Sequence, residues 1–245
     1  MHICDLQKVM IDDPIFEINN NSKRNIVLFG NCHVSVIGFY LNEILGKKYN
    51  IAIIFSSLRN IWKPYTDAEK QKVWTKIEKS HYFVYQEHKE DYNINASSIT
   101  KYANYFKILI PNLQLIFTDE YGKEIEDEQL QNDFNKSFQL CKQKIEKTKF
   151  KNFMFILENY KKIRFFTIPR HPTNYVLYLL SLQIANRIIG TNYVITLSEY
   201  HKHKNDKIFL ESETVILGDI FPYKSEQCQL LGIDYNSEFY DKKCK

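Results

Sequence analysis

Two short apolar runs, NIVLF at 25–29 and NIAIIF at 50–55, constrain the fold more than any other feature of the chain. Each run is typical of a strand that is buried on both faces. Between the runs, apolar residues recur with the period of one helix face over 35–45, where Ser35 is placed to cap the helix and Gly46 to end it. A strand, a helix and a strand in this order predict a parallel unit with a right-handed crossover.

The remaining sequence continues to alternate between the two patterns. It predicts further helices at 67–78, 97–106, 124–149 and 172–189, and further strands at 82–85, 114–117, 164–168, 193–197 and 207–217. This alternation is typical of helices covering both faces of a mostly parallel sheet. We therefore expect an α/β protein, a three-layer α/β/α sandwich in a single domain over 1–245. Residues 1–24 are expected to form an irregular N-terminal arm, and the charged stretch 124–160 a helical insertion or lid.

The composition is that of a globular protein with a sizeable core, because 44% of the 245 residues are apolar. The net charge of +4 suits anionic substrates or cofactors. It does not predict nucleic-acid binding, which needs a concentrated basic face. With seven glycines, the chain is not expected to use a glycine-rich phosphate-binding loop.

The cysteine pattern and the apolar segments predict a cytoplasmic protein. The five cysteines stand at 4, 32, 141, 228 and 244, an odd number without a Cys-x-x-Cys pair, so neither a zinc ribbon nor a thioredoxin motif is expected. We expect these thiols to be reduced. The N-terminus lacks the apolar core of a signal peptide. The most apolar stretch, 175–189, is too short and too polar to span a membrane.

The motif Gly30-Asn31-Cys32-His33 carries the main functional prediction. It places a thiol at the carboxyl end of a strand and at the start of a helix, the edge at which open α/β sheets bind their ligands. Backbone N–H groups and the helix dipole at such a position favour the thiolate, so we expect a lowered pKa and a nucleophilic Cys32. The alternative is that Cys32 is a small buried apolar residue.

The neighbours of Cys32 are suited to stabilise an oxyanion. Gly30 permits a tight turn, and the amide of Asn31 and the N–H groups that open the helix can donate to a negatively charged oxygen. His33 either lines the pocket or caps the helix; its side chain need not reach the sulfur of Cys32.

His171 is the second catalytic candidate. It stands between an expected strand and the strongest expected helix, so it would share the carboxyl edge of the sheet with Cys32. There it could take a proton from the thiol or from an incoming nucleophile. The alternative is a helix-entry residue held by Pro172. Arg170 is a candidate for a phosphate contact, to which Arg164 and its lysine neighbours would add; otherwise these charges form a solvated face.

Other polar residues give weaker signals. His201 and His203 have the spacing of a metal-binding tract, but no third ligand is evident, so a solvated loop is favoured and no metal is expected. Asp119, Glu120 and Asp219 are acids at expected strand ends, and the sequence places none of them beside His171.

Three ordered motifs resemble the WcbI family of capsular-polysaccharide biosynthesis proteins, a family associated with acetyl transfer. They are Gly30-Asn31-Cys32, the strand 82–85 followed by Gln86, and His171-Pro172 opening a helix that ends at Gly190. The chain departs from the family at His33, where the family usually has glutamine.

The resemblance implies an SGNH-hydrolase-like fold, with cysteine in place of serine, and binding of coenzyme A. It implies that Cys32 and His171 are the reactive pair and that Asn31 and Gln86 line the site. Ile168 stands where SGNH hydrolases have aspartate, so a dyad is expected rather than a triad.

We therefore expect an acetyl-CoA-dependent transferase that acts on a sugar or a nucleotide-linked amino sugar in surface glycan synthesis. The acyl group would pass through Cys32, or directly to the acceptor with His171 as base. An esterase or deacetylase of the same fold is the first alternative. A non-catalytic sugar- or nucleotide-binding protein, whose aromatic residues stack on sugar rings, is the second.

Overall fold

The computed structural model describes residues 12–56, 63–87, 94–116, 125–168, 171–191, 196–203, 206–207 and 225–233. The chain divides into two compact units. The first comprises residues 1–110, 177–193 and 204–216, and the second comprises 111–176, 194–203 and 217–245. The single-domain organisation over 1–245 stays a prediction.

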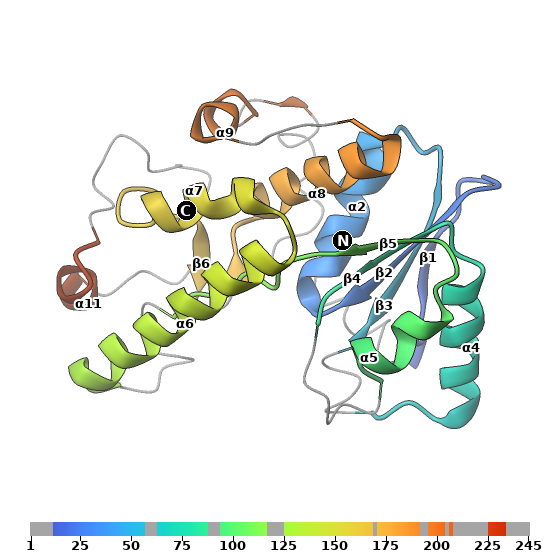
Figure 1. Ribbon diagram of the computed structural model, residues 1–245, viewed down its shortest axis with the longest axis horizontal. Helices are drawn as coiled ribbons and strands as arrows, with labels where there is room; N and C mark the ends of the chain where they lie inside the picture. The colour runs from blue at the N-terminus through green and yellow to red at the C-terminus, as the bar shows by residue number, and fades with distance from the viewer. Residues whose placement is uncertain are drawn as a thin grey trace. The chain divides into compact units, whose positions relative to one another are not determined.

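The first unit contains a five-stranded mixed sheet (Figure 1). Its strands are β1 (Phe16–Ile18), β2 (Asn25–Gly30), β3 (Asn50–Phe55), β4 (Tyr82–Tyr85) and β5 (Phe106–Leu109), in the order β1-β3-β2-β4-β5. Strands β3, β2, β4 and β5 are parallel to one another, whereas β1 pairs antiparallel with β3. The prediction of an irregular arm over 1–24 is therefore wrong for residues 16–18, which form an edge strand.

Helix α2 (Cys32–Ile44) packs closely on one face of this sheet. A Cβ atom on Gly38 would lie 2.5 Å from Cδ1 of Ile53, so the helix backbone approaches β3 as only glycine allows. Helix α8 (Asn174–Ile189), whose residues from Leu177 onward belong to this unit, lies on the same side. There the ring of Tyr178 packs edge-on against Tyr40 of α2, with centroids 5.3 Å apart.

Helix α4 (Asp67–Glu78) covers the opposite face (Figure 1). Thr66 and Glu69 form a capping box at its start. Its buried residues Val73 and Ile77 pack with the inward side chains of the strands and with the short helix α5 (Ala96–Ile99), which is followed by the 3-10 turn η1 (Thr100–Tyr102). Helices therefore lie on both faces of the sheet, and the first unit has an α/β architecture.

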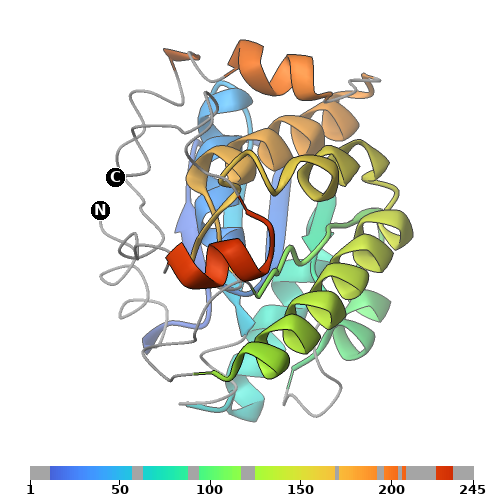
Figure 2. The ribbon, with the colours of Figure 1, turned by 90° about the vertical axis from the view of Figure 1, so that its left-hand side faces the viewer.

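The second unit is mainly helical. Its helices are α6 (Asp127–Lys147), α7 (Met154–Asn159), α9 (Leu197–His203) and α11 (Ser225–Leu230), which Figure 2 shows in the colours of Figure 1. The unit also contains the 3-10 turn η2 (Lys151–Phe153), the first turn of α8, and a hairpin of β6 (Phe166–Ile168) and β7 (His171–Pro172). Its core includes an aromatic cluster in which the rings of Phe155, Phe165, Tyr175 and Tyr200 contact one another. The helical character predicted for 124–160 holds for α6 and α7.

Several elements confirm the sequence pattern. Strands 50–55 and 82–85 and helix 67–78 have the predicted bounds. The helix predicted at 97–106 is wrong, because only α5 and η1 are helical and Phe106 begins β5 by pairing with β4. Residues 114–116 form no strand.

Four further predictions in the second half of the chain were inexact or lie largely outside the described residues. The strand predicted at 164–168 is β6, which pairs antiparallel with β7 instead of joining the main sheet. Helix α8 begins at Asn174 rather than at Pro172, because the hydroxyl of Thr173 accepts the N–H of Val176. Of the strands predicted at 193–197 and 207–217, residue 197 begins α9, residue 207 is helical, and residues 193–195 and 208–217 lie outside the described residues.

Candidate functional site

The carboxyl ends of β2, β3 and β4 form the candidate site. Strand β3 lies on one side of β2 and β4 on the other, and helices α2 and α4 lie on opposite faces. The chain thus reverses its direction of winding at β2. In doubly wound sheets, ligands bind in the crevice at such a switch point. The residues that follow these strands are Asn31, Ser56 and Gln86.

Gly30 and Gln86 fit each other closely at this edge. A Cβ atom on Gly30 would lie 2.4 Å from Oε1 of Gln86 and 2.5 Å from Cγ1 of Val34, so a larger residue would force these side chains to move. The same Oε1 atom accepts the backbone N–H of Asn31 at 3.0 Å. The buried hydroxyl of Ser56 donates to the carbonyl of Gly30 at 2.9 Å. The side chains of Gln86 and Ser56 therefore hold the backbone of the Gly30–Asn31 turn in place.

Asn31 determines where helix α2 begins. Its Oδ1 atom accepts the N–H of His33 at 3.0 Å, and its carbonyl accepts the N–H of Val34 at 3.1 Å. Asn31 is therefore the N-cap, and the prediction that Ser35 caps the helix is wrong. Ser35 lies within the first turn, where its hydroxyl donates to the carbonyl of Cys32.

Cys32 occupies the first position of α2; the residue as a whole is partly exposed, but protein surrounds its thiol. Burial of the sulfur raises the pKa of the thiol to about 12, although hydrogen bonds from the N–H groups of Cys32 and His33 lower it. The prediction of a lowered pKa is therefore wrong, because the loss of hydration outweighs the contribution of the helix N-terminus. At neutral pH the side chain is a protonated thiol.

The side-chain amide of Gln86 has a hydrogen-bond donor without an acceptor among the described residues. The residue is 0% exposed, and its Nε2 atom has no hydrogen-bond partner among the described residues. Leaving such a donor buried costs about 1–3 kcal/mol, which a carbonyl or oxyanion of a ligand would recover. Gln86 was expected in the site from the family resemblance. Ser56 was not predicted, because its only sequence signal is a hydroxyl directly after a buried strand.

The other predicted residues fall in different places. His33 is 1% exposed, and Asn31 performs the capping that was one of its two predicted roles; pocket lining stays a prediction. His171 is partly buried in β7 of the second unit, so its pairing with Cys32 of the first unit also stays a prediction.

The two arginines predicted to contact phosphate differ in what the structure says of them. Arg164 is 5% exposed, and its Nε atom donates to the carbonyl of Phe166 at 3.2 Å, a role that stabilises its own segment. Burial raises the pKa of the neighbouring Cys228 thiol, and the charge of Arg164 acts in the opposite direction. Arg170 lies outside the described residues.

The weaker candidates remain without support. The prediction of a solvated loop at His201 and His203 is wrong, because both lie on helix α9, where Nε2 of His203 is 3.4 Å from Oε2 of Glu199. Within the described ranges, no group of three potential ligands is placed to hold a metal ion. Asp119, Glu120 and Asp219 lie outside those ranges. In the part of the chain that was searched, no helix combines the length and the apolar character needed to cross a membrane.

Comparison with models of protein families found no match to this chain, and comparison with curated proteins found none either. The evidence on function is therefore the arrangement at the carboxyl edge of the sheet: a close-packed glycine turn, a thiol at a helix N-terminus, and a buried amide with an unsatisfied donor. Together these groups are suited to hold a carbonyl oxygen beside the start of α2.

Proposed function

We propose that the protein is an acyl-CoA-dependent acyltransferase that moves an acetyl group onto a hydroxyl or amine of a sugar or nucleotide-linked amino sugar. The proposal includes an SGNH-like arrangement of the fold, the WcbI-like family, a cytoplasmic location and a role in surface glycan or capsule synthesis. The observation that carries it is the buried Nε2 atom of Gln86, unsatisfied within the described structure, beside the Gly30–Cys32 turn. This donor, with the N-terminus of α2, suits the oxyanion of a tetrahedral intermediate.

The raised pKa of the Cys32 thiol favours direct transfer of the acetyl group from coenzyme A to the acceptor. Cys32, with a pKa of about 12, is a weak nucleophile at neutral pH. In the direct route, His171 takes the proton of the acceptor as its oxygen or nitrogen attacks the thioester carbon. The carbonyl becomes an oxyanion held by Gln86. The carbon–sulfur bond then breaks, and the thiolate of coenzyme A receives the proton.

The covalent route uses the same groups in two steps. His171 removes the proton of Cys32 as the sulfur attacks the thioester, and coenzyme A leaves as a thiol. The hydroxyl or amine of the acceptor then attacks the carbonyl carbon of the acetyl group on Cys32, the carbon–sulfur bond breaks, and the sulfur leaves and regains its proton through His171. This route requires His171 to act on a thiol whose proton is held tightly.

Coenzyme A is a substrate in either route, and the described residues account for one part of it. The acyl carbonyl fits the donors at the start of α2. The phosphates of coenzyme A need cationic partners, and the guanidinium of Arg164 already donates a hydrogen bond to the carbonyl of Phe166. We therefore assign the phosphate contact to Arg170, with Arg164 supporting that segment.

The test uses radiolabelled acetyl-CoA with a panel of nucleotide-linked amino sugars, followed by peptide mapping. We expect a labelled sugar product whose formation falls at least about a hundredfold in Gln86→Leu, since removing one oxyanion donor has that effect. Cys228→Ala serves as the matched control. Label on a peptide containing Cys32 selects the covalent route, whereas near-normal turnover by Cys32→Ala excludes it.

Two outcomes would replace the proposal. Release of acetate from an acetylated sugar without coenzyme A would identify an esterase or deacetylase. The raised pKa of Cys32 also favours a second candidate, a sugar- or nucleotide-binding protein without catalysis. Full biological activity of the double variant Cys32→Ser/His171→Ala would select that candidate.

A further inference from the structure

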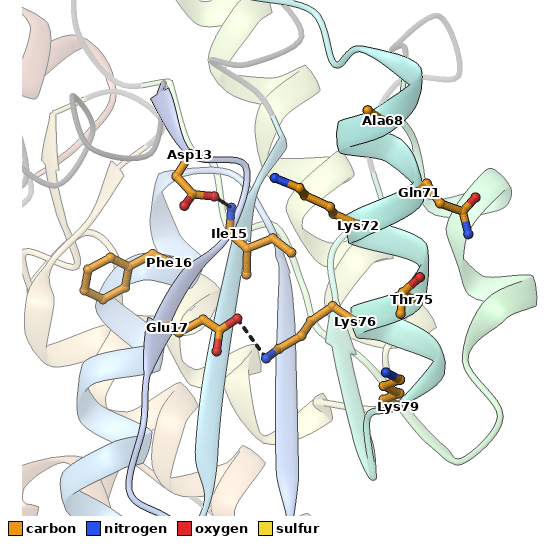
Figure 3. Close-up of a pocket in the computed structure, with 10 residues that line it drawn as sticks. All are labelled: Asp13, Ile15, Phe16, Glu17, Ala68, Gln71, Lys72, Thr75, Lys76 and Lys79. Carbon is orange, nitrogen blue, oxygen red and sulfur yellow. Dashed lines mark hydrogen bonds and ion pairs between the residues drawn. The ribbon is translucent and has the colours of Figure 1, made fainter.

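A groove runs between strand β1 and helix α4 in the first unit (Figure 3). Its volume is about 760 Å³, within the range of about 300–1,000 Å³ that is typical of ligand sites. It follows α4 from Ala68 to Lys79, a length of about 16 Å at the rise of an α-helix. None of the residues assigned to acyl transfer lines it, so a ligand bound here would be separate from the proposed reaction.

The strand side of the groove is the edge of the sheet. Ile15 and Glu17 lie toward α4, whereas Phe16 lies on the other side, where its ring packs on Phe39 with centroids 5.9 Å apart (Figure 3). Strand β1 pairs with β3 along one edge, and no other described strand pairs with it. Its outer edge therefore offers backbone groups to an added strand.

The helix side carries positive charge. Lys72 and Lys76 of α4 and Lys79, its C-cap, are spaced to lie on one face of the helix. Nζ of Lys76 is 2.9 Å from Oε1 of Glu17, so this pair is neutral. Lys72 and Lys79 are exposed, and neither has a carboxylate within 4.0 Å among the described residues. Two lysine charges without a close carboxylate among the described residues thus stand about 10 Å apart along the helix, in a groove that Asp13 also lines.

We propose that this groove binds an extended acidic segment of a partner protein, which adds to the outer edge of β1 and places carboxylates beside Lys72 and Lys79. Strand addition to a sheet edge supplies main-chain hydrogen bonds, and alternate side chains supply specificity. Successive side chains on one face of a strand stand about 6.7 Å apart, within reach of long lysine side chains. A sugar chain fits less well, because Phe16, the one aromatic residue among the described lining residues, turns away from the groove.

The test measures binding of a fluorescent peptide with alternating glutamate and valine to the full chain by anisotropy. We expect saturable binding that weakens as salt is added. The charge-reversed double variant Lys72→Glu/Lys79→Glu should bind at least about tenfold more weakly. The matched control Lys136→Glu/Lys142→Glu makes the same charge change on exposed lysines of α6 and should bind as the wild type does. Circular dichroism establishes that both variants are folded.

A second pair of peptides tests the added strand. In a strand pair, alternate backbone N–H groups face the partner. N-methylation of one alternate set should therefore abolish binding, whereas methylation of the other should leave it unchanged. The proposal is overturned if the wild type shows no saturable binding, if both charge variants lose binding equally, if the two methylated peptides bind alike, or if an acidic oligosaccharide displaces the peptide at lower concentration than unlabelled peptide does.

Discussion

The contact between Gly30 and Gln86 gives the sharpest prediction, because two substitutions that each destabilise the protein should partly compensate each other. In Gly30→Ala, the new methyl group would lie 2.4 Å from Oε1 of Gln86 and 2.5 Å from Cγ1 of Val34. Such overpacking costs about 1–3 kcal/mol of the free energy of unfolding. In Gln86→Ala, the N–H of Asn31 loses its acceptor, which costs about 1–3 kcal/mol in a buried site.

The double variant Gly30→Ala/Gln86→Ala removes the atom with which the methyl group collides. We therefore expect its destabilisation to be smaller than the sum of the two single effects by at least about 1 kcal/mol, a coupling typical of residues in contact. The assay is guanidinium unfolding of the four proteins, with midpoints compared at equal denaturant dependence. Gly190→Ala is the matched control, because a Cβ atom there meets nothing within 4 Å.

Gly190→Ala alone should lower the free energy of unfolding, because the backbone there has a φ of +79°. Its effect should add to that of Gln86→Ala in the double variant Gly190→Ala/Gln86→Ala. Additivity of Gly30→Ala and Gln86→Ala to within about 0.5 kcal/mol would refute the close fit on which the candidate site depends.

Three further predictions follow from single groups. Because burial raises the pKa of Cys32 to about 12, its protonated form stabilises the fold below the unfolded pKa of about 8.5, and this stability is lost as the pH rises toward 12. The free energy of unfolding of Cys32→Ala should therefore fall less steeply with rising alkaline pH than that of the wild type. Equal slopes for the two proteins would contradict the burial of the Cys32 thiol. For the same reason, iodoacetamide should modify Cys32 in the native protein at pH 8 much more slowly than in the unfolded chain; equal rates, read by peptide mass spectrometry, would argue for a reactive thiolate. Thr66→Ala removes the capping box of α4 and should cost about 1 kcal/mol of unfolding free energy, whereas an unchanged denaturation midpoint would show that the cap contributes nothing.

Local sequence patterns predicted the centre of the first unit well. The runs that became β2 and β3 are apolar without interruption, as expected of strands buried on both faces, and Ile26 to Phe29 are all 0% exposed. Helix α4 had an amphipathic period, so its bounds were readable, and the structure added the capping box at its start. The Gly30–Cys32 motif was placed correctly at the end of β2, because the apolar run before it marked where the strand ends.

Edge strands were not readable in this way. Strand β1 has three residues, and in β5 Phe106 and Lys107 are exposed, so neither shows the pattern of a buried strand. Both are extended because they pair with β3 and β4, residues distant in the sequence. A pairing partner of this kind cannot be inferred from local periodicity.

Local sequence signals were enough to specify the strand-turn-helix that brings a glycine, an asparagine and a cysteine to the central strand, because short-range periodicity and chain breakers define such units. Tertiary structure alone decided the chemical state of that cysteine. The helix N-terminus favours the thiolate, but the protein packed around the sulfur removes its water and raises the pKa to about 12. Packing also explains why Gly30 must be glycine, since the atoms that exclude a side chain there belong to Gln86 on another strand end and to Val34 on the following helix.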